Sequence, residues 1–183
     1  FAVVALSGEH SQQERNQAMQ ALRDRRARVC VATDVAARGI DLPGVFILRN
    51  LQDADELGRL VPPVLEAAGG TPVFVKFAPD LNDEALHRSV EVVRTLGASG
   101  IVATNTTVSR AGLPDLTEAG GLSGRPLWPL AKAKIGVVLD AAGPLPVIGA
   151  GGVTTGAQVR ELLAMGCAAV QLYSALVVEG PGL

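Results

Sequence analysis

The chain has 183 residues, a size typical of one domain, and 48% of them are apolar, which is sufficient for one sizeable core. Its net charge of -2 and the lack of a Lys/Arg block argue against a nucleic-acid partner. The apolar stretches are interrupted within about ten residues, short of the ~20 that a spanning helix needs, and no secretory signal is recognisable. We therefore expect a cytoplasmic protein. Its two cysteines form neither a disulfide framework nor a metal-type spacing, so no metal site is expected.

Short runs rich in Val and Ile alternate with helix-length segments along the chain, which is typical of βα units and a parallel sheet. The predicted strands are Ala2–Leu6, Arg28–Thr33, Pro72–Phe77, Gly100–Thr104, Leu145–Gly149 and Ala168–Tyr173. The predicted helices are Ser11–Arg26, Leu51–Ala68, Asp83–Leu96, Trp128–Ala142 and Thr155–Met165. The first of these helices opens on a capping box, Ser11-Gln-Gln-Glu14. The pattern predicts an α/β fold.

The segment from Leu145 to Gly152 is the clearest candidate for a binding site. A predicted strand ends in Gly149-Ala-Gly-Gly152 and a helix start follows, so backbone N–H groups can approach an anion there. The next predicted strand ends in Tyr173-Ser174, which adds hydroxyl groups at the neighbouring strand end. A tight structural turn explains a lone glycine run equally well. The pairing of two strand ends favours a phosphate site of the kind that (β/α)8 barrels carry.

Polar residues also mark the two preceding strand ends. Lys76 interrupts an apolar strand, where a buried ammonium needs an anionic partner and could stabilise negative charge on a ring or carbonyl. The alternative is an edge-strand lysine that reaches solvent. Thr104-Asn-Thr-Thr107 suits recognition of a planar polar ring, although such a run is also an ordinary turn. Gly120-Gly-Leu-Ser-Gly124 supplies a flexible backbone that could close over a ligand.

Several strings between Leu48 and Gly182 carry a family resemblance. They are Leu48-Arg-Asn-Leu-Gln52, Val75-Lys-Phe-Ala-Pro-Asp-Leu81, Ala103-Thr-Asn-Thr-Thr-Val-Ser-Arg110, Gly120-Gly-Leu-Ser-Gly-Arg-Pro-Leu127, Pro146-Val-Ile-Gly-Ala-Gly-Gly152, Val170-Gln-Leu-Tyr-Ser174 and Glu179-Gly-Pro-Gly182. In this order and spacing, residues 48–183 resemble the carboxyl part of a dihydroorotate dehydrogenase of the quinone-using, membrane-associated class. The resemblance implies a (β/α)8 barrel that holds FMN and oxidises dihydroorotate to orotate in pyrimidine synthesis. It implies FMN contacts from Lys76, Thr104, Gly124, Gly152, Tyr173 and Ser174, and pyrimidine contacts from Asn105 and Thr106.

The sequence departs from this family just before Leu48. There the family has a segment of the form Asn-x-Ser-Ser-Pro-Asn-Thr, which supplies the catalytic serine base and asparagines for the substrate. This chain has Asp41-Leu-Pro-Gly-Val-Phe-Ile47, and no serine or asparagine lies between Asn16 and Asn50. Proton abstraction needs a base within hydrogen-bond reach, so we expect no catalytic residue and little activity. The family's earlier barrel strands and membrane helices are also expected to be missing, which makes a quinone acceptor doubtful.

Residues 1–45 resemble a different family. The strings Leu6-Ser-Gly-Glu-His-Ser-Gln12 and Val31-Ala-Thr-Asp-Val-Ala-Ala-Arg-Gly-Ile-Asp-Leu-Pro43 are similar to the second RecA-like domain of a DEAD-box RNA helicase. The resemblance implies that Thr33 touches RNA phosphate and that Gly39 and Asp41 lie near the nucleotide. The P-loop lysine, the acidic box and the downstream arginine motif are not found in the sequence, so we expect neither helicase nor ATPase activity.

Together these patterns predict a chimera of two α/β pieces joined near Val45. Residues 1–45 are expected to form a helicase-like βαβ unit, and residues 46–183 an FMN-binding barrel fragment, packed as one unit. The fold is an incomplete (β/α)8 barrel of about six strands, whose open sheet edges favour self-association. The expected function is a dihydroorotate dehydrogenase fragment that binds FMN and dihydroorotate or orotate, with little or no activity. The alternatives are an RNA-binding helicase remnant and an inactive fusion.

Overall fold

The computed structural model describes most of the chain beyond residue 52. The described residues are 53–111, 113, 120–180, the strands Val3–Leu6, Val29–Ala32 and Phe46–Leu48, and Ser11, Gln13, Glu14, Gln17 and Gln20. The predicted joint near Val45, the helicase-type positions Thr33, Gly39 and Asp41, and most of the first predicted helix lie outside them. Within the described part of the chain, no helix combines the length and apolarity needed to cross a bilayer.

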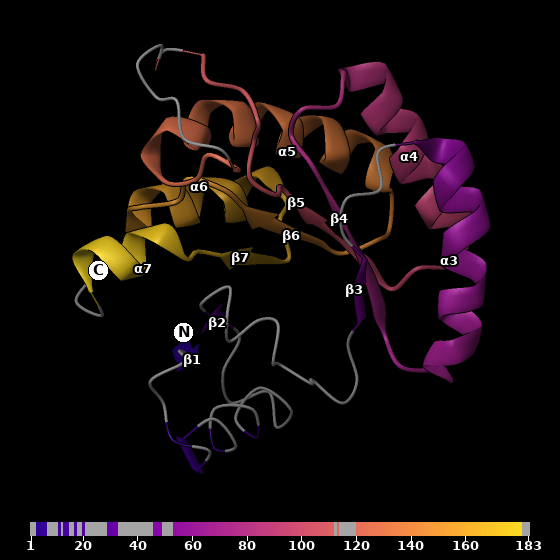
Figure 1. The fold of residues 1–183 in the computed structure, drawn as a ribbon, viewed down its shortest axis with the longest axis horizontal. Helices are drawn as coiled ribbons and strands as arrows, with labels where there is room; N and C mark the ends of the chain where they lie inside the picture. Colours follow the sequence, from indigo (N-terminus) through magenta and orange to yellow (C-terminus); the bar gives the residue numbers. More distant parts are fainter. Residues whose placement is uncertain are drawn as a thin grey trace.

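A five-stranded parallel sheet is the centre of the fold (Figure 1). Its strands lie in chain order, β3 (Phe46–Leu48), β4 (Val73–Phe77), β5 (Gly100–Ala103), β6 (Val147–Ala150) and β7 (Ala169–Gln171). Each strand pairs in parallel with the next one along the chain. A doubly wound sheet changes direction at a switch point, whereas a (β/α)8 barrel adds strands in sequence. The strand order is therefore that of a barrel segment.

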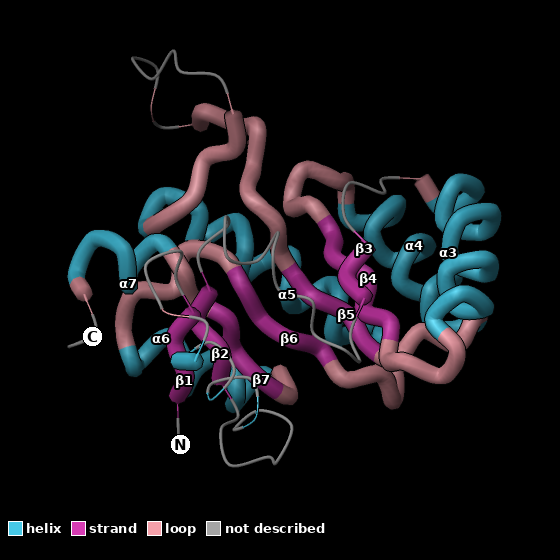
Figure 2. Tube along the Cα trace, turned by 60° about the horizontal axis from the view of Figure 1, so that its bottom comes forward, coloured by secondary structure: helices cyan, strands magenta, loops and turns pink. Residues whose placement is uncertain are grey.

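All six predicted strands are present, but they do not form one sheet. β1 (Val3–Leu6) and β2 (Val29–Ala32) exist as predicted, but they form a separate two-stranded parallel sheet. They do not pair with β4, whose neighbours are β3 and β5. β2 lies near β7 (Figures 1 and 2). β3 was not predicted, because three apolar residues are too few to display a strand period.

The helices agree closely with the predicted ranges. Four of them lie within predicted ranges, α3 (Ala54–Ala68), α4 (Asp83–Thr95), α5 (Trp128–Ala142) and α6 (Gly156–Met165). The helix α7 (Ser174–Glu179) and a short 3-10 turn η1 (Arg125–Leu127) before α5 had no predicted range. The Asn82 side chain caps α4, and Thr155 with Gln158 forms a full capping box on α6. The predicted box at Ser11 and Glu14 is also present. The start of α3 lies at Ala54 because Asp53 caps it.

The core lies between one face of the sheet and the covering helices (Figure 2). In β4, Val73, Val75 and Phe77 are fully buried, whereas the alternate residues Phe74 and Lys76 are half-buried. This alternation shows that one face of the strand packs on the helices and the other face carries Lys76. The largest fully buried members of the core are Phe77, Leu57, Leu86, Ile101, Ile135 and Leu162.

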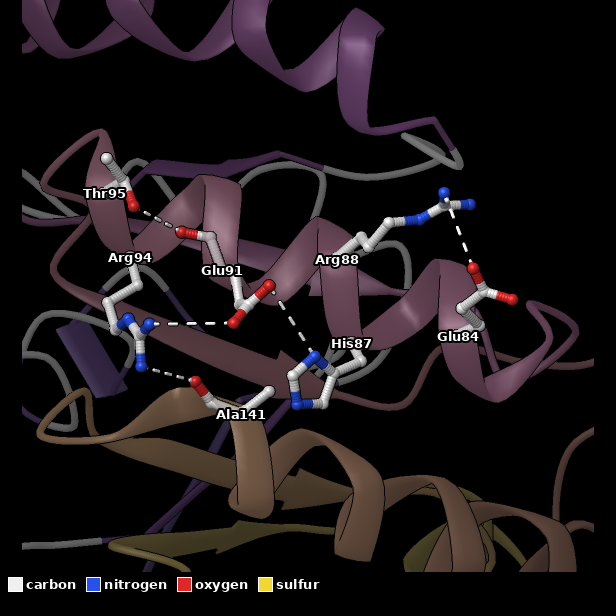
Figure 3. A network of polar contacts seen from close by, with 7 residues as sticks. All are labelled: Glu84, His87, Arg88, Glu91, Arg94, Thr95 and Ala141. Atoms are coloured by element: carbon white, nitrogen blue, oxygen red, sulfur yellow. Dashed lines mark hydrogen bonds and ion pairs between the residues drawn. The ribbon is translucent and has the colours of Figure 1, made fainter.

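The outer surface of α4 carries a chain of polar contacts (Figure 3). Arg94 donates from Nη1 to the backbone oxygen of Ala141, 3.0 Å away, and so joins α4 to the end of α5. His87 is exposed, and its Nδ1 lies 3.7 Å from Glu91 Oε2 one turn further on. Exposed pairs of this kind contribute little to stability. The network therefore reads as a solvated helix face rather than a site.

Candidate functional site

Lys76 lies on the sheet face opposite the helices, one residue before the end of β4. Strand register aligns it with Val102 of β5, which in turn aligns with Ile148 of β6. Because β4 lies between β3 and β5, the alternative of an edge-strand lysine is wrong. The ammonium therefore projects from the middle of the sheet towards the face that a barrel interior would occupy.

The segment that follows β5 is bonded to both neighbouring strand ends. Thr104 is 3% exposed and donates to the Ala150 backbone oxygen, from its amide at 2.6 Å and from its hydroxyl at 3.3 Å. The Asn105 amide donates to the Phe77 backbone oxygen at 2.8 Å. The Asn105 side chain is half-buried and Thr106 is exposed. Thr104 is thus fixed inside the sheet edge, while the next two side chains lie at its rim.

A glycine cradle joins the end of β6 to the start of α5. A Cβ on Gly152 would lie 2.4 Å from the Trp128 amide nitrogen and 2.9 Å from the Gly124 backbone oxygen. A Cβ on the preceding Gly151 would lie 2.9 Å from Thr104 Oγ1. Both glycines have positive φ, of 116° and 70° for Gly151 and Gly152. The predicted glycine run therefore has to be glycine, for conformation and for space.

Ser174 brings the end of β7 to the same place. Its hydroxyl donates to Ser123 Oγ at 2.9 Å, and its Cβ would lie 3.8 Å from a Cβ on Gly124. Tyr173 is the residue directly before α7, its side chain makes no capping hydrogen bond to the helix, and it is 37% exposed. An ion pair between Arg125 Nη2 and Glu179 Oε1, 2.6 Å long, also joins η1 to α7.

The structure therefore brings most of the predicted site residues together. Thr104, Gly152, Gly124 and Ser174 form a continuous series of neighbours through Gly151. Lys76 and Asn105 lie at the adjoining strand ends, at the same edge of the parallel sheet. For the Tyr173 and Thr106 side chains the structure gives position but no polar contact. The structure places these residues near one another, and their contacts with FMN and a pyrimidine stay a prediction.

Sequence reasoning missed three residues that build the rim of this edge. Ser123 meets Ser174, and Asp80 accepts a 2.5 Å hydrogen bond from the buried Thr107 hydroxyl. Asp80 lies in a string that carries the family resemblance, directly after β4, so a polar residue at a strand end was the available signal. Thr107 was visible only as part of an Asn-Thr run.

Two features lie away from the strand ends. A pocket of about 340 Å³ opens between α3 and α4 and is lined by Asp53, Ala54, Asp55, Ala85, Arg88 and Ser89, none of which is a predicted site residue. Cys167 is buried beneath β6, and burial raises the pKa of its thiol to about 11. Among the described residues, no group of His, Cys, Asp and Glu could hold a metal ion.

Comparison with known proteins gives two matches at different places in the chain. A family model described as dihydroorotate dehydrogenase matches residues 28–183, and a model described as helicase conserved C-terminal domain matches residues 1–53. The two matched ranges overlap around β2 and β3, so the change of resemblance falls in the region that includes the predicted joint.

Curated relatives and solved structures agree with the first match. The chain is similar to dihydroorotate dehydrogenase (quinone) of Myxococcus xanthus, 44% identical over 155 residues, which is 81% of this chain and 42% of the relative. The Halobacterium salinarum enzyme of the same name is 40% identical over 158 residues, covering 85% and 45%. A crystal structure of the Eimeria tenella dihydroorotate dehydrogenase with ferulenol matches in fold, with a TM-score of 0.67 at 24% identity, over 89% of this chain and 58% of that one.

This chain spans less than half the length of the curated relatives it matches. The match nevertheless covers the whole five-stranded sheet and every residue of the candidate site. The chain therefore belongs to the dihydroorotate dehydrogenase family.

Proposed function

We propose that the chain is an FMN-binding fragment of a dihydroorotate dehydrogenase that turns over little or no dihydroorotate. The observation that carries this proposal is the contiguous series Thr104, Gly151, Gly152, Gly124 and Ser174 at the carboxyl edge of the sheet. Barrels of this class bind phosphate at that edge, through the last strands and their loops. The relatives named above supply the reaction by analogy.

The residues present fit the chemistry of FMN. The cradle around Gly152 has no space for a side chain, as close approach of the backbone to a phosphate requires. The Ser174 and Ser123 hydroxyls add polar groups beside it. Lys76 would place positive charge on the sheet face where a flavin ring would lie, and Thr104 would border the ring. Bound FMN would supply the acceptor for the two electrons that leave dihydroorotate.

The pyrimidine would lie against the rim. Asn105 and Thr106 follow Thr104 directly and carry an amide and a hydroxyl, which match the carbonyl and N–H groups of dihydroorotate or orotate. We place no protein base at the reacting carbon, because the position of the family's serine loop holds Asp41-Leu-Pro-Gly-Val-Phe-Ile47. Removal of a carbon-bound proton without a positioned base is slow, since such a base contributes about 10²–10⁴-fold.

Flavin binding and turnover test the two parts of this proposal separately. Titration of the purified chain with FMN, followed by quenching of flavin fluorescence, should show saturable binding that Gly152→Ala weakens. Anaerobic addition of dihydroorotate to the loaded chain should then reduce the flavin far more slowly than in a complete family member. Loss of all bound flavin on gel filtration would refute the first part, and rapid reduction would refute the second.

The sheet topology favours a second copy of this chain as the partner. β3 and β7 are the outer strands of the sheet, and outer parallel strands offer unpaired backbone groups to another chain. Sedimentation at several concentrations should show a dimer or larger species. A quinone acceptor is supported only by the name of the relatives, dihydroorotate dehydrogenase (quinone).

The helicase match favours one alternative, an RNA-binding remnant. The match covers residues 1–53 and includes Thr33-Asp-Val-Ala-Ala-Arg38. Titration with single-stranded RNA at low salt decides this alternative, because phosphate contacts are strongest there. An inactive fusion would bind neither ligand, and its broad thermal unfolding would not change with FMN.

A further inference from the structure

We propose that Asp80 is a positioning residue that holds Asn105 and Thr106 in place for the pyrimidine. The inference rests on the proposed function, because it assigns a role within the same site. Asp80 lies in the turn after β4, and the two ligand-facing residues lie in the segment after β5. Its carboxylate therefore acts across two neighbouring strand ends.

Asp80 contacts the residues that come directly after the ligand-facing pair. Its Oδ1 accepts a hydrogen bond of 2.5 Å from Thr107 Oγ1, a side chain only 3% exposed. The Val108 amide lies 3.3 Å from each carboxylate oxygen and donates to them. Hydrogen bonds to an ionised acceptor are stronger than neutral ones. The carboxylate thus fixes one side-chain donor and one backbone donor.

The pair is held at its other end by the sheet itself. The Thr104 amide donates to Ala150 and the Asn105 amide donates to Phe77, so the start of the segment is bonded to β6 and β4. Only Thr106 lies between the Asn105 amide, which is bonded to the sheet, and Thr107, which is bonded to Asp80. A span this short has little freedom once both ends are held.

A strip of the following loop packs over the same segment. Thr107 and Leu122 exchange two backbone hydrogen bonds of 3.2 and 2.7 Å. Gly121 approaches so closely that a Cβ there would lie 2.0 Å from Thr106 Oγ1. Arg110 donates to the Gly120 backbone oxygen at 2.6 Å and closes the strip. Thr107 is bonded both to Asp80 and to Leu122. Displacement of Thr107 would therefore move the turn after β4 and the strip at Gly121 relative to Thr106.

Loss of the carboxylate should act on the pyrimidine and not on FMN. The flavin-side residue Thr104 is fixed by Ala150, and the cradle at Gly152 and Gly124 makes no contact with Asp80. In Asp80→Ala the buried Thr107 hydroxyl loses the acceptor to which it donates, so the segment can shift. In Asp80→Asn the amide oxygen can still accept from Thr107, but the amide nitrogen cannot accept from Val108.

The test uses the full chain loaded with FMN, titrated with orotate and followed by the change in flavin absorbance. Asp80→Ala should weaken orotate binding about tenfold to hundredfold, as expected for the loss of charge-assisted hydrogen bonds. Asp80→Asn should lie between Asp80→Ala and the unchanged chain. FMN affinity should stay as in the unchanged chain, and the thermal midpoint should fall by only a few degrees, as the loss of the acceptor for one buried hydroxyl predicts. Asp140→Ala, which removes an exposed carboxylate from α5, is the matched control and should have no effect.

Each other result would count against the proposal. Equal orotate affinity in Asp80→Ala and the unchanged chain would overturn it while leaving the proposed function intact. A parallel fall in orotate affinity, FMN affinity and thermal midpoint would assign Asp80 a general structural role instead. If the unchanged chain binds no FMN or no orotate, the proposed site itself is refuted and the role of Asp80 falls with it.

Discussion

Substitution of Gly152 by alanine tests whether the glycine cradle is built as closely as the structure indicates. Gly152 has a φ of 70°, and an added Cβ would lie 2.4 Å from the Trp128 nitrogen, 2.6 Å from Trp128 Cα and 2.9 Å from the Gly124 oxygen. All three are backbone atoms, so no side chain can rotate away. The β6 end or the start of α5 must move instead.

The cost has two parts that a matched control separates. A left-handed conformation costs a non-glycine residue about 1–2 kcal/mol, and forced displacement in a packed region costs roughly 1–3 kcal/mol more. Gly69 ends α3 with a φ of 54°, and an added Cβ there meets nothing within 4 Å. Gly69→Ala should therefore show only the first part, whereas Gly152→Ala should lose about 2–5 kcal/mol in total.

Urea unfolding of the two variants, with flavin titration beside it, measures both effects. Gly152→Ala should unfold at a lower urea concentration than Gly69→Ala and should bind FMN at least about tenfold more weakly, a difference of about 1.4 kcal/mol. Gly69→Ala should bind FMN like the unchanged chain, because α3 contributes no residue to the candidate site. Equal stability of the two variants would refute the close packing, and unchanged flavin affinity would refute the cradle.

Three further predictions concern stability. Burial raises the pKa of Cys167 to about 11 from its ordinary value of 9.0, so between these pH values the folded state keeps a proton that the unfolded state loses. The contribution of Cys167 to the free energy of unfolding is fully present below pH 9 and falls by roughly 2–3 kcal/mol as the pH rises to 11. In pH-dependent urea unfolding, Cys167→Ala should remove this part of the loss. Glu179→Gln should cost less than about 1 kcal/mol, and 1 M salt should remove the difference, because the Arg125 partner is largely exposed. Lys134→Met should lower the free energy of unfolding by about 1–2 kcal/mol in urea unfolding, because the half-buried ammonium donates to the Leu81 backbone oxygen and to Asp83. An unchanged free energy of unfolding would show that water can replace these hydrogen bonds.

Much of the fold was predictable because its elements carry local signals. The strand at Val73–Phe77 is apolar at every position except Lys76, and α6 ends at Met165, as predicted. β3 gave no such signal, because three residues display no period. The separation of β1 and β2 from the main sheet was not predictable either. Pairing between strands far apart in the chain depends on packing that no local pattern records.

The candidate site shows the same division. The glycines at the end of a predicted strand indicated the cradle in advance, because a cluster of glycines is explained by close backbone approach or by positive φ. The role of Asp80 could not be read from the sequence, since its partner Thr107 lies 27 residues away on another strand end. Lys76 was identified correctly as a charge within an apolar strand. Its place in the middle of the sheet, which excludes an edge-strand position, required the strand order.

The position of β3 bears on the proposal that this chain binds FMN but turns over little dihydroorotate. β3 ends at Leu48, which pairs with Val75 beside Lys76, and Leu48 is also the first residue of the first string shared with the family. The family's serine segment precedes that string, so it would reach the sheet beside the strand that carries Lys76. Here Phe46–Leu48 occupies this edge with apolar residues and leads directly into the shared string. The sheet thus keeps the neighbour that supports Lys76, while residues 17–49, which lead into the shared string, contain no serine or asparagine.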